Sequence, residues 1–202
     1  MNRGCPMIVC VMSVIWGIGC GPMVLAMYEP ISIRTVVEQG VCIEVVNPSV
    51  RFTFDEAGLA PRQLPLDATE PTVADYLGTS LKAEFEASGY RVLEGPSCDV
   101  AVRIQVKQVA LARAESVLLP PIVILRRQAM VVDVDVRAEL PRVGRSFRRR
   151  FAKVEEDSFA FVFFVPIGFR SPSELLLETS QGCLSEIVRE VTRLVESIER
   201  GT

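Results

Sequence analysis

Two long segments of the chain alternate between apolar and polar residues, and this pattern constrains the fold more than any other feature. Apolar residues take every second position in residues 100 to 106, and again in residues 130 to 140. A period of two is typical of β-strands that bury one face. After residue 106 the phase changes, which predicts either a β-bulge near Lys107 and Gln108 or a change of the buried face. Both segments are therefore predicted to be long strands.

Shorter segments complete the predicted sheet, because they are rich in β-branched and aromatic residues. They are residues 41 to 46, 50 to 54, 90 to 93 and 145 to 154. The last of these follows a turn at residues 141 to 144, so it can return as the antiparallel partner of the strand before it and end at the acidic residues 155 to 157. Residues 56 to 71 contain several prolines and are predicted to form a loop.

The first predicted helix is recognised by its capping residues and its apolar spacing. Thr72 and Asp75 form a start like that of a capping box, and apolar residues then recur at intervals of four as far as Phe85. Gly89 ends the helix, because glycine adopts the left-handed conformation that often follows a helix end. The charged Glu84 is expected on the polar face of this helix.

The second predicted helix begins at Ser171, Pro172 and Glu174, and its apolar stripe runs from Leu184 to Ile198. The predicted fold class is α+β: a largely antiparallel sheet of about five strands with two amphipathic helices packed on one face. A chain of 202 residues with 49% hydrophobic content can bury the core of one such domain, which we assign to residues 41 to 202.

The beginning of the chain differs from the rest. Residues 7 to 27 include no Asp, Glu, Lys or Arg, and Arg3 is the single charged residue before them. Such a run indicates an export or membrane segment. Within it, the small residues Gly17 and Gly19 precede Cys20.

This arrangement resembles a bacterial lipoprotein signal peptide, which is cut before a cysteine that then carries acyl chains. The resemblance implies that residues 1 to 19 are a signal peptide, that Cys20 is the lipidation site and that residues 20 to 40 form a lipidated tether. Gly21 is similar to the residue found at this position in lipoproteins of the outer membrane. The expected location is therefore the cell envelope, as an outer-membrane lipoprotein that faces the periplasm.

The alternative for the same segment is an uncleaved transmembrane helix. The 21 residues from 7 to 27 would span the hydrocarbon layer of about 30 Å at a rise of about 1.5 Å per residue. The glycines and Pro22 in this range disfavour a continuous helix. Both interpretations place residues 30 to 202 outside the cytoplasm.

The absence of histidine from the sequence excludes several classes of enzyme. A Ser-His-Asp triad, a Cys-His pair and the zinc sites of metalloproteases all need histidine. The sequence also lacks the glycine-rich motifs that bind nucleotide phosphates, and its formal charge of −3 gives no general attraction to nucleic acid. We therefore expect a protein that is not an enzyme and that has no catalytic residues, no metal site, no cofactor and no nucleic-acid partner.

Three cysteines remain if the signal peptide is removed and Cys20 is acylated, and two interpretations of them are open. They are Cys42, Cys98 and Cys183. Each can be a buried small apolar residue, or two of them can form a disulfide in an oxidising envelope and leave one thiol free.

Two groups of charged residues are candidate sites. Asp133 and Asp135 are predicted to lie on one side of a strand about 7 Å apart, as a pair of catalytic carboxylates or as part of a solvated face. Basic residues dominate the following hairpin, where they form either a binding surface for lipid phosphate, anionic glycan or an acidic partner, or an ordinary solvated face. The candidate binding residues are Arg145, Arg148, Arg149 and Arg150.

Two apolar runs that contain prolines, residues 117 to 125 and residues 159 to 169, resist regular strand geometry. Each is predicted to be either part of the core or a patch that faces a membrane or a partner.

From Thr72 onward, the predicted order is a helix, the segment SGYRVLEGPSCDVAVRIQVKQV at residues 88 to 109, a hairpin and a terminal helix. This order is similar to that of YajG-type envelope lipoproteins, the lipopolysaccharide-assembly lipoprotein and the auxiliary lipoproteins of lipid-transport ABC systems. The resemblance implies a lipid-anchored accessory of assembly or transport that binds a lipid-like ligand or a protein partner. Curli-secretion channel lipoproteins share the order, which implies the alternative of a subunit of an oligomeric outer-membrane secretion channel.

Overall fold

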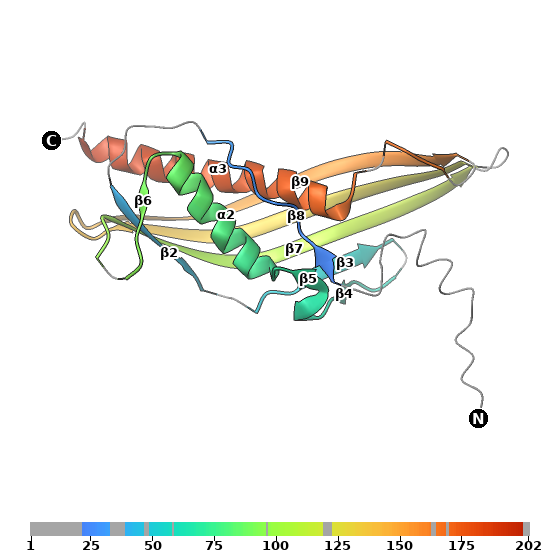
Figure 1. Cartoon of the computed structure of the whole chain (residues 1–202), viewed down its shortest axis with the longest axis horizontal. Coiled ribbons are helices and arrows are strands. Elements are labelled where there is room, and N and C mark those ends of the chain that lie inside the picture. Colours follow the sequence, from blue (N-terminus) through green and yellow to red (C-terminus); the bar gives the residue numbers. More distant parts are fainter. Residues whose placement is uncertain are drawn as a thin grey trace, which may run out of the picture.

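The structure is a computed structural model that describes residues 22–32, 39–46, 49–57, 59–95, 97–118, 123–162, 165–168 and 170–199. Its central feature is an antiparallel ribbon of three long strands: β7 (Val100–Leu118), β8 (Val123–Leu140) and β9 (Arg145–Val162). Figure 1 shows that the ribbon runs along the whole length of the domain. The predicted hairpin is confirmed, and β9 continues past the acidic residues 155 to 157 at which the sequence predicted an exposed end.

Shorter strands extend the ribbon at both edges. Along one edge of β7, β2 (Gly40–Val45) and β3 (Phe52–Glu56) pair in succession, both parallel to it. β6 (Arg91–Val92) lies beyond β2, β4 (Arg62–Gln63) lies beyond β3, and β10 (Val165–Ile167) pairs with β9. A separate two-stranded sheet joins β1 (Met23–Val24) to β5 (Thr69–Glu70), just after the short 3-10 helix η1 (Leu66–Ala68).

The prediction of a largely antiparallel sheet of about five strands is therefore wrong in two respects, because the main sheet has eight strands within the described residues and is mixed. Strands of two or three residues are too short to show a period of two in the sequence. The parallel pairings depend on where the chain returns to β7, and no local pattern encodes that.

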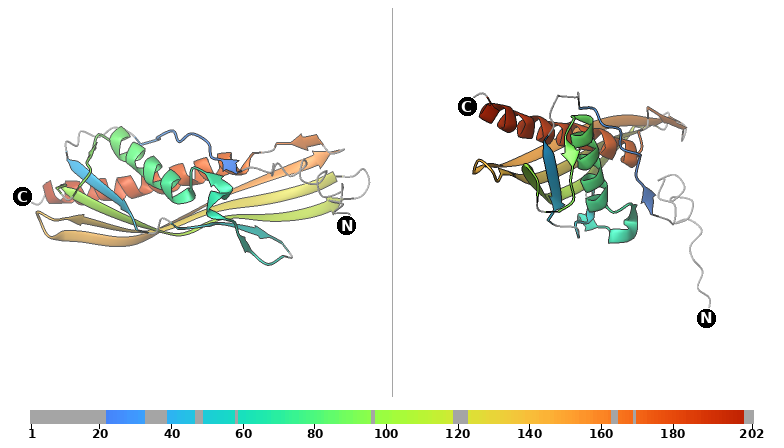
Figure 2. Two further views of the ribbon diagram at one scale, coloured as in Figure 1. Left: turned by 60° about the horizontal axis from the view of Figure 1, so that its bottom comes forward. Right: turned by 60° about the vertical axis from the view of Figure 1, so that its left-hand side comes forward.

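Two helices cover one face of the sheet, as predicted. They are α2 (Val73–Ala87) and α3 (Pro172–Glu199), and both views in Figure 2 place them on the same side. The Oγ1 of Thr72 accepts a hydrogen bond from the amide of Asp75, and Gly89 has a φ of 98°. No helix in the described part of the chain is both long and apolar enough to cross a membrane.

The core lies between these helices and the ribbon. A register shift between Val106 and Gln108 moves the buried positions of β7 from even to odd numbers, so Val109 continues on the same face as Val106. The structure therefore confirms the predicted β-bulge. We call the face under α2 and α3 the helix face and the opposite side of the ribbon the open face.

Candidate functional site

The first described residues form an extended segment that is attached to the domain at several points. Met23 and Val24 pair with β5, Leu25 is buried, and the amide of Gln181 donates a hydrogen bond to the backbone carbonyl of Glu29 at 2.7 Å. Figure 1 shows this segment running across α2 and α3. The predicted tether at residues 20 to 40 is thus packed against the domain over residues 22 to 32.

Glu84 of α2 holds this segment in place. Its side chain is fully buried and accepts hydrogen bonds from the hydroxyl of Tyr28 at 2.7 Å and from the amides of Ile31 and Ser32 at 2.9 and 3.1 Å. Burial and the hydrogen bond to Glu84 raise the pKa of Tyr28. The prediction that Glu84 lies on the polar face of the helix is therefore wrong. Its spacing of three from Leu81 puts it on the buried stripe, a signal that its charge concealed.

The lipidation residue Cys20 lies outside the described residues, two positions before Pro22. The uncleaved transmembrane helix over residues 7 to 27 would include Met23 and Val24, which instead form β1. A continuous helix over that whole range is therefore incompatible with the packing of residues 22 to 27 against the domain.

The predicted carboxylate pair lies on the open face, where both aspartates bind basic residues. Arg150 donates to Asp133 through two nitrogens at 2.8 and 2.5 Å, and Asp133 is only 4% exposed. Asp135 forms ion pairs with Lys107 at 3.3 Å and Arg148 at 3.5 Å. The hydrogen bonds with Asp133 raise the pKa of Arg150. The charges on this part of the face compensate one another.

The four candidate binding arginines do not share one surface. Arg148 and Arg150 project from the open face, whereas Arg149 projects from the helix face, pairs with Glu190 of α3 at 2.5 Å and lies 5.5 Å from the ring centre of Phe151. Arg145 is at the start of β9, opposite Leu140. Charged side chains on a strand at the edge of a sheet discourage unwanted pairing with other strands.

A different pair of arginines is buried on the helix face, and we call Arg113 and Arg126 the inner arginine pair. Arg113 alternates along β7 with the core residue Leu111, and Arg126 alternates along β8 with Gln128; each arginine is 5% exposed. Their guanidinium carbons lie 5.2 Å from the ring centre of Phe54 and 5.7 Å from that of Phe159, respectively.

The two inner arginines differ in their hydrogen bonding. Arg126 forms an ion pair with Glu115. The Nε and Nη1 of Arg113 are buried and have no hydrogen-bond partner among the residues that the structure describes. Burial and the positive charge of Arg126 lower the pKa of Arg113 to about 10, while Glu56 acts in the opposite direction, so Arg113 is charged at neutral pH.

We call the end of the ribbon formed by Leu118, Val123 and Val162 the ribbon tip. The inner arginine pair lies near this tip on the helix face. Gln128, next to Arg126 on this face, donates to the backbone carbonyl of Arg170 at 2.8 Å, immediately before α3 begins. Arg126 is therefore closer to the ribbon tip than the start of α3, and Figures 1 and 2 show the three strands extending past that helix. Sequence reasoning missed both arginines, although Arg113 follows the apolar positions Val109 and Leu111 on one face of its strand.

The two proline-containing apolar runs meet at this tip. The register pairs Val123 with Val162, so the start of β8 in the first run lies beside the end of β9 in the second. Phe159 is buried and Leu125 is 42% exposed. Residues 119–122, 163–164 and 169, which belong to these runs, lie outside the described residues.

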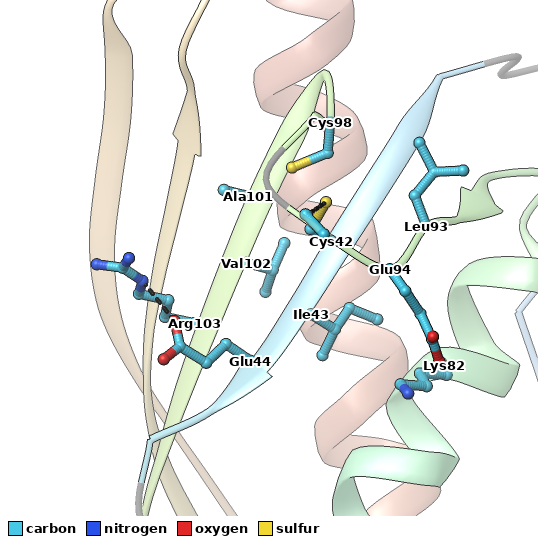
Figure 3. Close-up of a pocket in the computed structure, with 11 residues that line it drawn as sticks. Cys42, Ile43, Glu44, Lys82, Leu93, Glu94, Cys98, Ala101, Val102 and Arg103 are labelled. Carbon is cyan, nitrogen blue, oxygen red and sulfur yellow. Dashed lines mark hydrogen bonds and ion pairs between the residues drawn. The ribbon is translucent and has the colours of Figure 1, made fainter.

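A pocket at the other end of the sheet contains two of the three cysteines. It has a volume of about 460 Å³ between β2, the start of β7 and the β6–β7 connection, and its lining includes Cys42, Leu93 and Cys98. Figure 3 shows the Cys42 and Cys98 side chains beside each other at its wall. Cys183 is buried in α3, and burial raises the pKa of its thiol to about 12.

Comparison with solved structures finds a similar fold in protein XCC0632 from Xanthomonas campestris, of the family model DUF330. The TM-score is 0.52 at 14% identity, over 90% of this chain and 97% of that chain. A neuraminyllactose-binding hemagglutinin homologue from Helicobacter pylori has a TM-score of 0.46 at 10% identity, over 88% of this chain and 99% of that one. Lipoprotein GNA1162 from Neisseria meningitidis has a TM-score of 0.27 at 11% identity, over 78% and 98%. Neither a family model nor a curated protein matches the sequence. The comparison with XCC0632 shows a shared α+β fold.

Proposed function

We propose that this chain is a lipid-anchored envelope protein that acts as a non-enzymatic accessory of assembly or transport. The observation that carries the ligand part of the proposal is Arg113, a buried cation with two nitrogens that have no partner among the described residues. A buried charge is costly unless an opposite charge accompanies it, so this position favours an anionic ligand.

The surroundings of Arg113 support a ligand that is lipid-like. Phe54 and Phe159 lie against the two inner arginines, and the apolar runs of the ribbon tip follow directly. The anionic head group of such a ligand would lie beside Arg113, and its apolar chain would extend along the apolar residues toward the ribbon tip. Phosphate and carboxylate groups both suit the planar donor set of a guanidinium.

The distance along the chain between Cys20 and the domain limits how far the domain can lie from the proposed anchor. Two residues span at most about 7 Å, so acyl chains on Cys20 would hold β1 close to the membrane surface. The exposed residues next to this point include Val24 at 71% and Met27 at 88%. We infer that the β1–β5 corner faces the lipid head groups.

The proposal includes no catalysis, because the two carboxylates that the sequence suggested as catalytic residues form ion pairs with basic side chains. Asp133 is bound by Arg150, and Asp135 lies between Lys107 and Arg148. An enzyme that used these carboxylates would lose its reaction in Asp133→Asn.

Metabolic labelling with palmitate tests the anchor. We expect label in the wild-type protein, none in Cys20→Ala, and a mature chain that begins at Cys20. Label that persists in Cys20→Ala, or a mature protein that still carries Met1, would refute the anchor.

Binding of a fluorescent phosphatidylglycerol to the detergent-solubilised protein tests the ligand site. Loss of one charge-assisted contact in Arg113→Gln should weaken binding at least about tenfold. Arg103→Gln is the matched control, because Arg103 lies on the open face, is half-exposed and pairs with Glu44 at 2.8 Å. Equal binding by both variants and by the wild type would exclude the inner arginine pair as the site.

A ring-forming secretion subunit is the second candidate, and the open edge of β9 favours it. β10 covers β9 at residues 160 to 162, and residues 145 to 159 have no strand on that side within the described ranges. A neighbouring copy that paired there would continue the sheet. A large oligomer on native gels, lost when detergent is changed, would favour this candidate, whereas an accessory would run as a small species.

A further inference from the structure

We propose that Cys42 and Cys98 form a disulfide in the exported protein, and that Cys183 remains a buried thiol. This pairing accounts for the odd number of cysteines that remain once Cys20 is acylated. It is independent of the ligand site and rests on the proposed export alone, since disulfides persist in oxidising compartments.

The backbone brings the two cysteines to the same end of a parallel strand pair, Cys42 within β2 and Cys98 in the segment that leads into β7. Cys42 of β2 lies opposite Ala101 of β7, and Cys98 precedes Ala101 by three residues in the segment that leads into β7. That segment is fixed to β2, because the amide of Asp99 donates to the carbonyl of Gly40 at 2.9 Å and its carboxylate accepts from the amide of Gly40 at 2.8 Å. These two hydrogen bonds hold the segments that carry Cys42 and Cys98 together.

The two side chains lie near each other. Figure 3 shows Cys98 next to Cys42 at the wall of the pocket. The pKa of Cys42 is raised to about 11, mainly by burial and then by a hydrogen bond and a charge interaction with Cys98. Cys42 also donates a hydrogen bond to the carbonyl of Gly95 at 2.9 Å, and the disulfide would give up that bond.

Both cysteines are accessible to an oxidant, whereas Cys183 is not. Cys42 and Cys98 are partly exposed at the wall of the pocket described above, and Cys183 is 1% exposed within α3. A protein disulfide supplied by an envelope thiol oxidant can therefore reach the pair. A thiolate of the pair attacks that disulfide to form a mixed disulfide and the first thiol of the reduced oxidant. The second cysteine thiolate then displaces the second thiol, so the oxidant carries away both electrons and both protons.

The bond would close a loop that includes β3, β4, η1, β5, α2 and β6. A constraint on so long a loop reduces the freedom of the unfolded chain. We expect the oxidised protein to unfold at a temperature higher than the reduced protein by about 4 to 16 °C.

Thiol mapping of the full chain, extracted from bacterial membranes in detergent, tests the pairing. Free thiols are blocked with N-ethylmaleimide under denaturing conditions, and the digest is analysed by mass spectrometry without reduction. We expect a linked peptide pair that contains Cys42 and Cys98, and alkylation of Cys183. The link should persist in Cys183→Ala and vanish in Cys98→Ala. Alkylation of both Cys42 and Cys98 in the wild-type protein from the envelope would overturn the proposal.

A second arm separates this inference from the proposed export. If the protein is recovered from the cytoplasmic fraction, export has failed, and the folded protein is then treated with oxidised glutathione. Formation of the Cys42–Cys98 link under this treatment supports the pairing, and its absence refutes it.

Discussion

At the residue scale, Glu84 shows how one charged side chain sets the course of a distant segment. Its carboxylate binds three donors from residues 28 to 32, more than 50 positions earlier in the chain. A carboxylate with no exposed surface is tolerated because these donors replace the water it has lost. Glu84, which the sequence pattern placed on the polar face of its helix, therefore holds the N-terminal segment through which the protein would be anchored.

Replacing Glu84 by Ala should lower the free energy of unfolding by about 3 kcal/mol or more, because charge-assisted hydrogen bonds are lost and two backbone amides lose their acceptor. Urea denaturation of the protein in detergent measures this loss. Glu86→Ala, at an exposed position of the same helix, should cost under about 0.5 kcal/mol. Similar small losses in both variants would mean that residues 28 to 32 are not held by Glu84.

At the element scale, local signals predicted both helices, the long strands and three of the shorter strands, β2, β3 and β6, but failed for other strands of two or three residues. The caps of α2 and α3, the hairpin of β8 and β9 and the bulge in β7 were all predicted, because each depends on residues close together in sequence. The strands β1, β4 and β5 were not predicted. Each has two residues and forms by pairing with another segment, and β4 and β5 lie within residues 56 to 71, which were predicted to be a loop. The short strand β6 was predicted within residues 90 to 93.

The candidate site was predicted less well, for a similar physical reason. The basic residues of β9 are adjacent in sequence but alternate between the two faces, so their charges separate. The inner arginine pair comes together only when β7 and β8 pair, and its members lie among apolar neighbours that favour a core interpretation.

Phe85 tests how α2 is packed. It is fully buried and its ring meets that of Tyr90 edge to face at a centroid distance of 5.2 Å. Phe85→Ala should remove about 3 to 5 kcal/mol of stability, since the transfer free energy and the cavity contribute together. Thermal unfolding of this variant beside Glu86→Ala measures the difference. An unfolding temperature equal to that of the control would contradict the packing of α2 on the sheet.

At the scale of the whole molecule, the two ends of the sheet have different roles in this account. The end near β6 and the β6–β7 connection contains the cysteine pair, and the ribbon tip lies next to the inner arginine pair. The proposed anchor at Cys20 precedes β1, which packs beside β5 between these ends, as Figure 1 shows. A lipid anchor so close to the domain would keep the helix face near the membrane from which a lipid-like ligand comes.

Native mass spectrometry of the protein extracted from membranes tests this central claim most directly. We expect a mature chain that begins at an acylated Cys20 and carries a bound anionic lipid. Arg113→Gln should lose the lipid while keeping or raising the unfolding temperature, because it removes a buried charge without a complete set of partners. Arg103→Gln should retain the lipid. A wild-type protein that carries no anionic lipid, or an Arg113→Gln variant that carries as much as the wild type, would contradict the account.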